Sequence, residues 1–157
     1  MKKFELTNEF IANRFGTKLF RIRALVEFGD VEAGELGGYV EKESNLGHDD
    51  NAWVYGDAQV SGDARVRGDA RVCGNGDYAY AHGFGSVNRT TTFFRLKDGG
   101  VGVRCGCFYG TLAQFRDKIR ETHGETKKAQ EYLMLADLME LRFEEDENEV
   151  GNRKYVE

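Results

Sequence analysis

The strongest chemical constellation in this sequence is a predicted β-hairpin that carries arginine and phenylalanine. Residues 90–96 and 101–105 flank Lys97-Asp98-Gly99-Gly100, and Asp-Gly is a strong signal for a two-residue turn. With that turn, the core face pairs Leu96 with Val101, Phe94 with Val103 and Thr92 with Cys105. The other face places Phe93 opposite Arg104, and Arg95 opposite Gly102.

Arginine offers a fork of donors to phosphate, and an aromatic ring can stack on a base. This second face therefore predicts a binding site for a small anionic, nucleotide-like ligand. The alternative is that the face packs against another element, with the arginines at its rim. The predicted ligand-binding residues, drawn from this hairpin and from neighbouring strands or subunits, are Arg95, Arg104, Phe93, Arg89, Arg21 and Arg23.

Histidine and cysteine give weaker signals for catalysis and for metal binding. His48 and His82 lie near the ends of a repeat described below, where a histidine base could deprotonate a hydroxyl or an amine. Cys105-Gly106-Cys107 lacks the Cys-x-x-Cys spacing of a structural zinc ribbon, and no second ligand pair accompanies it. We therefore expect no catalytic residue, no metal and no cofactor, with ordinary surface histidines as the better interpretation.

Composition and charge point to one soluble domain with a local basic region. The chain has 157 residues, 20 glycines, no proline and a net charge of −5. Residues 86–128 nevertheless carry nine bases against four acids, a local charge of +5. Such a region can recruit a small anion without general nucleic-acid binding. The three cysteines and the absence of a long apolar run favour a cytoplasmic protein without a membrane span.

A six-residue repeat occupies the middle of the sequence. Valine recurs at 54, 60, 66 and 72, and alanine follows four positions later at 58, 64 and 70. Gly-Asp pairs stand between them, where glycine relaxes φ and aspartate bonds to nearby backbone amides. A period of six fits a triangular coil of three short strands, with valine pointing inward and alanine at the crowded corner. Leu46 to Val54 is a step of eight, so two residues bulge out there.

The segment GELGGYVEKESNL…NAWVYGDAQVSGDARVRGDARV resembles the hexapeptide-repeat family of left-handed parallel β-helices. It is most similar to hexapeptide-repeat proteins of phages and prophages. The resemblance implies a short left-handed parallel β-helix over residues 34–75. Enzymes of the family are acyltransferases, usually with many more coils, and its other members are binding or structural scaffolds. Three-fold packing is usual in such proteins, so the resemblance implies a trimer or a multiple of it.

The flanking sequences predict caps for the open ends of this coil. Residues 19–26 alternate as a strand, and we expect an N-terminal antiparallel β cap over 1–38, followed by the β-helix over 39–85. Residues 86–143 predict the β-hairpin and two α-helices. The first begins at a capping box, Thr111 to Gln114, and the second spans 126–143 with an apolar stripe of double width. Residues 144–157 read as an acidic tail.

These observations favour a non-enzymatic, oligomeric binding protein, and the family resemblance implies a phage or prophage origin. In a phage setting, capture of a small anionic nucleotide-like ligand would suit sequestration of a host defence signal. A minimal acyltransferase is the first alternative, and a structural or protein-inhibiting assembly module is the second. An acyltransferase should bind an acyl carrier and lose activity when His48 or His82 is replaced.

Overall fold

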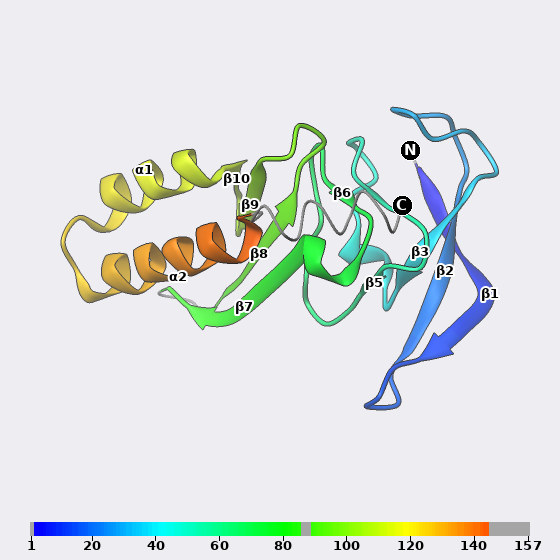
Figure 1. Ribbon diagram of the computed structural model, residues 1–157, viewed down its shortest axis with the longest axis horizontal. Coiled ribbons are helices and arrows are strands. Elements are labelled where there is room, and N and C mark those ends of the chain that lie inside the picture. Colours follow the sequence, from blue (N-terminus) through cyan, green and yellow to red (C-terminus); the bar gives the residue numbers. More distant parts are fainter. Residues whose placement is uncertain (1, 86–88, 145–157) are drawn as a thin grey trace.

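The computed structural model describes residues 2–85 and 89–144, and it shows a mainly β protein with two C-terminal helices. Three parts follow one another along the long axis of the molecule in Figure 1. An N-terminal sheet lies at one end, the short strands of the repeat lie in the middle, and a second sheet with both helices forms the other end.

The N-terminal sheet is antiparallel where the alternating sequence predicted a strand. Strand β1 (Phe4–Ala12) pairs antiparallel with β2 (Lys18–Ala24), which pairs antiparallel with β3 (Leu36–Val40). Phe4, Ile22 and Ala24 are buried on the face toward the repeat. The first part of the expected architecture, antiparallel strands ahead of the repeat, is therefore confirmed.

The repeat buries the side chains that its six-residue period predicted. Strands β4 (Trp53–Val54), β5 (Gln59–Val60) and β6 (Arg71–Val72) are each two residues long. All four repeat valines are fully buried, and all three repeat alanines are buried beside them. Gly56, Gly62 and Gly68 adopt φ of +58°, +66° and +70°, a region that favours glycine. Glycine at every turn is therefore a conformational requirement of the repeat.

The sheets are antiparallel or mixed, and in the described part of the chain they do not form an extended parallel solenoid. Within residues 2–85 and 89–144, parallel pairing is confined to β3 with β5, β4 with β6, and one bridge between Leu46 and Val66. The expected mainly β protein with C-terminal helices is thus confirmed, but no parallel β-helix over 39–85 is evident in the described residues. The pattern ends at Val72, and β7 (Tyr78–Phe84) pairs antiparallel with the next strand, so the chain leaves the repeat early.

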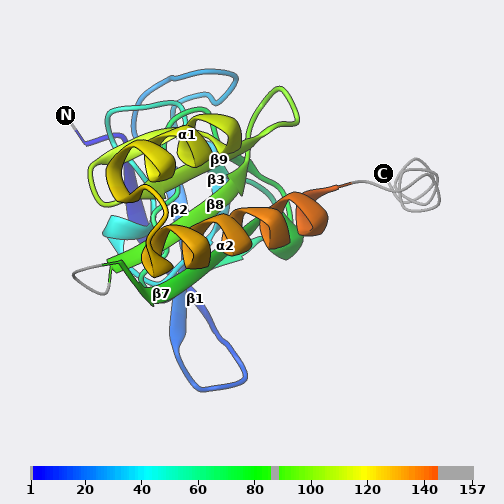
Figure 2. The same cartoon turned by 90° about the vertical axis from the view of Figure 1, so that its left-hand side faces the viewer.

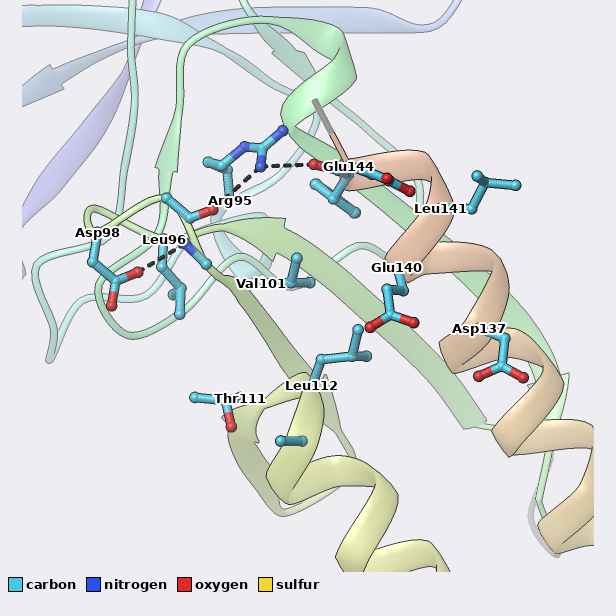
Figure 3. Close-up of a pocket in the computed structure, with 14 residues that line it drawn as sticks. Arg95, Leu96, Asp98, Val101, Thr111, Leu112, Asp137, Glu140, Leu141 and Glu144 are labelled. Atoms are coloured by element: carbon cyan, nitrogen blue, oxygen red, sulfur yellow. Dashed lines mark hydrogen bonds between the residues drawn. The ribbon is translucent and has the colours of Figure 1, made fainter. Parts of the chain in front are cut away.

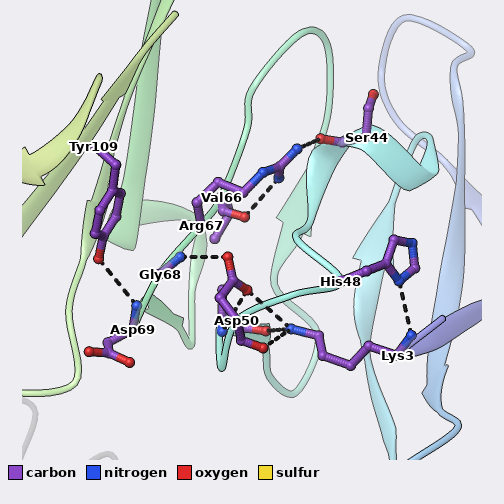
Figure 4. A network of polar contacts seen from close by, with 10 residues as sticks. Lys3, Ser44, His48, Asp50, Val66, Arg67, Gly68, Asp69 and Tyr109 are labelled. Atoms are coloured by element: carbon purple, nitrogen blue, oxygen red, sulfur yellow. Dashed lines mark hydrogen bonds and ion pairs between the residues drawn. The ribbon is translucent and has the colours of Figure 1, made fainter. Parts of the chain in front are cut away.

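The bulge between Leu46 and Val54 is held by a buried lysine. The Lys3 ammonium donates to the Asp50 carbonyl at 2.9 Å and to the Ala52 carbonyl at 2.6 Å, and it pairs with the Asp50 carboxylate at 3.4 Å. Asp50 in turn accepts from the backbone N–H of Gly68 at 2.7 Å (Figure 4). Burial lowers the pKa of Lys3, and the charge of Asp50 opposes that shift. These contacts tie the N-terminus, the bulge and the repeat together.

The C-terminal sheet has the order β10-β9-β8-β7 and is antiparallel throughout. It contains β8 (Arg89–Arg95), β9 (Val101–Cys105) and β10 (Phe108–Thr111) besides β7. The hairpin register differs by one residue from the predicted one, because Arg95 pairs with Val101 and Phe93 pairs with Val103. Leu96 and Gly100 close the loop through a backbone bond of 2.8 Å, so the turn is longer than Asp98-Gly99 alone. A slip of one residue reassigns cross-strand neighbours and faces.

Helices α1 (Leu112–His123) and α2 (Lys127–Phe143) cover one face of this sheet (Figure 2). The capping box at Thr111 and Gln114 is confirmed, and Gly124 ends the first helix with φ of +58°. The predicted stripe of α2 is buried at Ala129, Tyr132, Ala136, Met139 and Phe143. Neither helix in the described ranges is both long enough and apolar enough to cross a bilayer.

The outer face of α2 keeps an apolar strip. Met134, Leu138 and Leu141 are exposed by 71%, 55% and 67%, at the i, i+4, i+7 spacing of one helical face. We expect this strip to support the trimer that the family resemblance implies. Light scattering should then give about 53 kDa, three times the 17.7 kDa of one chain. A monomer at micromolar concentration would contradict this prediction.

Candidate functional site

The predicted hairpin site is not assembled, because its residues lie on opposite faces of the C-terminal sheet. Arg95 lies on the helix-covered face, where it donates to the carbonyl of Phe143 at 3.1 Å and to that of Gly99 at 3.3 Å (Figure 3). Its guanidinium also lies 5.1 Å from the centre of the Phe143 ring. Arg104 pairs with Thr92 on the other face. The clamp of Arg95 with Arg104 was therefore a wrong prediction, and the register explains the error.

Phe93 is a core residue. It is fully buried among the helices and β9, and its ring meets that of Phe115 edge-on at 6.0 Å. A ring with no exposed surface cannot stack on a ligand base. The predicted role of Phe93 in stacking was therefore wrong, for the same reason of register.

Arg21 and Arg23 belong to the N-terminal sheet and have partners there. Arg21 pairs with Glu9 and Asp57 and donates to the Tyr39 hydroxyl, while its guanidinium lies 4.3 Å from the Tyr39 ring centre. These contacts raise the pKa of Arg21, and the hydrogen bond with Glu9 is the largest cause. Arg23 pairs with Glu5. Both arginines stabilise their own sheet, and neither meets Arg95 or Arg104 in a pocket of the described chain.

Arg104 and Arg89 instead lie with two arginines of the repeat along a groove, which we call the arginine groove. It consists of two hollows of about 580 and 330 Å³ that share Arg104. Arg67 and His48 line the first hollow, and Arg65 and Arg89 line the second. The groove follows the junction between the repeat and the C-terminal sheet, where the backbone N–H of Arg65 donates to Thr92 Oγ1 at 2.9 Å.

Sequence reasoning missed Arg65 and Arg67, although a signal for them was present. Both flank Val66, which points into the repeat, so alternation along a strand directs both arginines outward from the same wall. Tyr109 fixes this wall to the sheet. Its hydroxyl accepts from the backbone N–H of Asp69 at 3.3 Å and lies where a Cβ on Gly68 would stand (Figure 4).

Like charges meet in the groove. Burial lowers the pKa of Arg67, Asp50 opposes the shift, and the positive charges of Arg104 and Arg65 lower it further. Arg67 donates to the carbonyls of Val66 and Ser44, both at 2.9 Å, which holds its guanidinium in place (Figure 4). Arg104 is bonded only through Nε, to the Gly106 carbonyl at 2.7 Å, among the residues that the structure describes. The rest of its donor fork is available to a ligand.

The acids around the groove mostly have lysine partners of their own. Asp63 pairs with Lys42 at 2.8 Å, Asp50 with Lys3 at 3.4 Å, and Glu43 with Lys2 at 3.3 Å. Lys42 is the largest cause of the lowered pKa of Asp63. Three of the four lining carboxylates are thus partly neutralised by cations outside the groove, which leaves the arginines with excess positive potential.

His48 is held in a way that does not suit a base. Its Nδ1 accepts the backbone N–H of Lys3 at 3.0 Å, so a neutral ring carries its proton on Nε2, which lies 3.5 Å from Glu43. The ring stacks on Phe4 with centres 4.3 Å apart. The lone pair that a general base needs is therefore already occupied.

His82 is held differently, beside the second hollow. It lies on β7 with its Nδ1 2.8 Å from Thr90 Oγ1, and Thr90 lines that hollow. When Nδ1 carries the ring proton, its N–H donates a hydrogen bond to Thr90 Oγ1, and Nε2 keeps a lone pair. His82 is exposed, so this lone pair is open to a reactant. In that tautomer, His82 has the arrangement that a base requires, whereas the backbone N–H of Lys3 excludes the corresponding tautomer of His48.

The three cysteines are not arranged as metal ligands. Cys105 is buried and accepts from Thr91 Oγ1 at 3.3 Å, whereas Cys73 and Cys107 are exposed. Within the described ranges, no group of three histidine, cysteine, aspartate or glutamate side chains is placed to hold a metal ion.

Comparison with known proteins gives one informative likeness, and no family model matches the chain. The chain is 37% identical over 62 residues to a protein of Escherichia coli (strain K12) named "Uncharacterized acetyltransferase YdcK". The match covers 35% of this chain and 19% of that protein, so the chain spans about a fifth of its relative's length. The relative bears an enzyme name, which contradicts the expectation of a non-enzymatic protein.

Proposed function

We propose that the arginine groove binds a phosphate-bearing, nucleotide-like ligand. The observation that carries this proposal is the convergence of Arg65, Arg67 and Arg104, whose charges oppose one another across a shared groove. A phosphate dianion would relieve that repulsion and accept from the unused donors of Arg104. The anionic ligand expected from the sequence is thus retained, at a different set of residues.

The scaffold for this site, on the same proposal, is one minimal left-handed coil of the hexapeptide type. Three parallel contacts support it, since Val40 pairs with Val60, Leu46 with Val66 and Val54 with Val72. Each joins positions 18 to 20 residues apart, close to the 18 residues that three hexads supply. The two sheets cover the ends of this coil and protect its open edges. Phage origin and capture of a defence signal stay predictions.

Acetyl-coenzyme A is the first ligand to test. The relative is named an acetyltransferase, and coenzyme A carries a nucleotide with several phosphates. Its phosphates match the charge of the groove, and the two hollows together provide about 910 Å³, the sum of 580 and 330 Å³. That space lies in the usual range for small-molecule sites.

Calorimetric titration with acetyl-coenzyme A tests the binding proposal. We expect Arg104→Ala to weaken binding by about 1.5–3 kcal/mol, the worth of a hydrogen bond to a charged group. Binding should also weaken as salt rises, because screening reduces the attraction between the arginines and phosphate.

Arg23→Ala is the matched control, since it removes the same charge from the N-terminal sheet. Equal weakening in both variants would mean that net charge alone explains the effect. If neither variant changes the affinity, the ligand binds elsewhere or the groove is not a phosphate site.

Acetyl transfer is a second candidate function, favoured by the exposed imidazole of His82, whose Nδ1 lies 2.8 Å from Thr90 Oγ1 at the edge of the groove. His82 would take a proton from an acceptor hydroxyl or amine. The acceptor would attack the thioester carbonyl, and the coenzyme A thiolate would leave. We expect His82→Ala to abolish release of free thiol while acetyl-coenzyme A still binds. His48→Gln should retain turnover, because His48 holds no free lone pair. Loss of turnover only in the His48 variant would contradict this assignment.

A further inference from the structure

A second cavity, separate from the arginine groove in all but one side chain, lies between the β9–β10 turn and the helices. Its volume is about 260 Å³. We call it the basic cavity. Its basic lining residues are Arg89, Lys118 and His123, and its main apolar lining residues are Phe108, Phe115 and Ile119. It is smaller than a typical site for a drug-sized molecule, so it suits a small ligand.

The walls of this cavity are fixed before any ligand arrives. The Phe115 ring lies 5.8 Å from that of Phe108 and 5.7 Å from that of Tyr132, at 49° and 90°. The Tyr132 hydroxyl lies 3.8 Å from Cys105 Sγ, which accepts from Thr91. Burial raises the pKa of Tyr132 to about 12, so its hydroxyl stays protonated at neutral pH. An aromatic or branched apolar group would enter a rigid, ring-lined space.

The charged side chains that line the basic cavity are all positive. The cationic side chains of Arg89 and Lys118 line the cavity, and no aspartate or glutamate lines it in the described part of the chain. Lys118 has an ion pair with Glu121 at 3.7 Å, but both side chains are more than half exposed. Exposed pairs of this kind contribute little, so Lys118 can turn to a ligand at small cost.

We propose that the basic cavity binds a small carboxylate with an apolar body, such as an aromatic or branched-chain acid. The apolar body would lie against Phe108, Phe115 and Ile119, and the carboxylate would meet Lys118 and Arg89 at the mouth. Arg89 lines both sites, but Lys118, His123 and Ile119 line only the basic cavity, so variants at these residues test it separately from the arginine groove.

Titration of the isotope-labelled protein with benzoate, followed by amide chemical shifts, tests the proposal. We expect saturable shifts at Ile119, Thr122 and His123, and no saturable shift with the neutral isostere benzamide. Lys118→Gln should weaken benzoate binding about tenfold, while Lys128→Gln, an exposed lysine on α2 outside the cavity, should leave it unchanged.

A second variant keeps the test independent of charge. Thr122 is exposed at the mouth, so Thr122→Phe should fill the cavity without disturbing the core and should remove benzoate binding. Equal binding of benzamide, shifts confined to other residues, or no saturation at tens of millimolar benzoate would each overturn the proposal.

Discussion

Val60→Asp and Val66→Asp should each leave the chain unable to fold. Both valines are fully buried inside the repeat, where a carboxylate would find neither water nor a cation. Burying an unpaired charge costs several kcal/mol or forces the group to take up a proton, and a domain of this size is stable by only about 5–15 kcal/mol. Circular dichroism should show no cooperative melting transition, and size exclusion should show aggregated or expanded protein.

Gln59→Asp is the matched control, because it introduces the same group on the same strand. Gln59 precedes the inward-pointing Val60 and is half-buried at the surface of the repeat. Its variant should melt within a few degrees of the parent protein. If both valine variants melt cooperatively near the parent temperature, the inward orientation of the repeat valines is wrong.

Phe93→Ala should cost about 3–5 kcal/mol of unfolding free energy, the usual effect of truncating a fully buried phenylalanine. The loss comes from contacts with Phe115 and with the core beneath the helices. Denaturant unfolding should show a lower midpoint with an unchanged slope. The same substitution at Phe15, which is 86% exposed, should change the free energy by less than about 0.5 kcal/mol. A mild effect at Phe93 would restore the face assignment that the Asp98-Gly99 turn predicted.

Much of the fold could be predicted because its signals are local. The inward valines, the glycine turns, the capping box at Thr111 and the buried stripe of α2 each follow from spacing within a few residues. The hairpin register could not be predicted so simply. Asp98-Gly99 is a good signal for a two-residue turn, but the observed loop runs from Leu96 to Gly100. The backbone N–H of Lys97 donates to the Asp69 carbonyl at 3.0 Å. A contact with a distant segment therefore helps to fix this loop.

The candidate site could likewise be predicted only in part from local sequence signals. Arg104 and Arg89 were expected as ligand-binding residues from the sequence, and both line the arginine groove. Their neighbours Arg65 and Arg67 come from the repeat, more than twenty positions earlier in the chain. The two groups are brought together by the docking of the C-terminal sheet against the repeat, to which Thr92 and Tyr109 contribute hydrogen bonds. Local pattern can suggest which arginines face outward, but it does not show which segments will meet.

Strand β8 places consecutive phenylalanines in two different cores. Phe94 packs with the repeat and the N-terminal sheet, while Phe93 packs with the helices, and both are fully buried. Because β8 contributes to both cores, opening either core at this strand would also expose part of the other core. The amide hydrogens of β8 should therefore exchange with deuterium only when the whole chain unfolds, which makes this strand the link through which the two halves unfold as one cooperative unit.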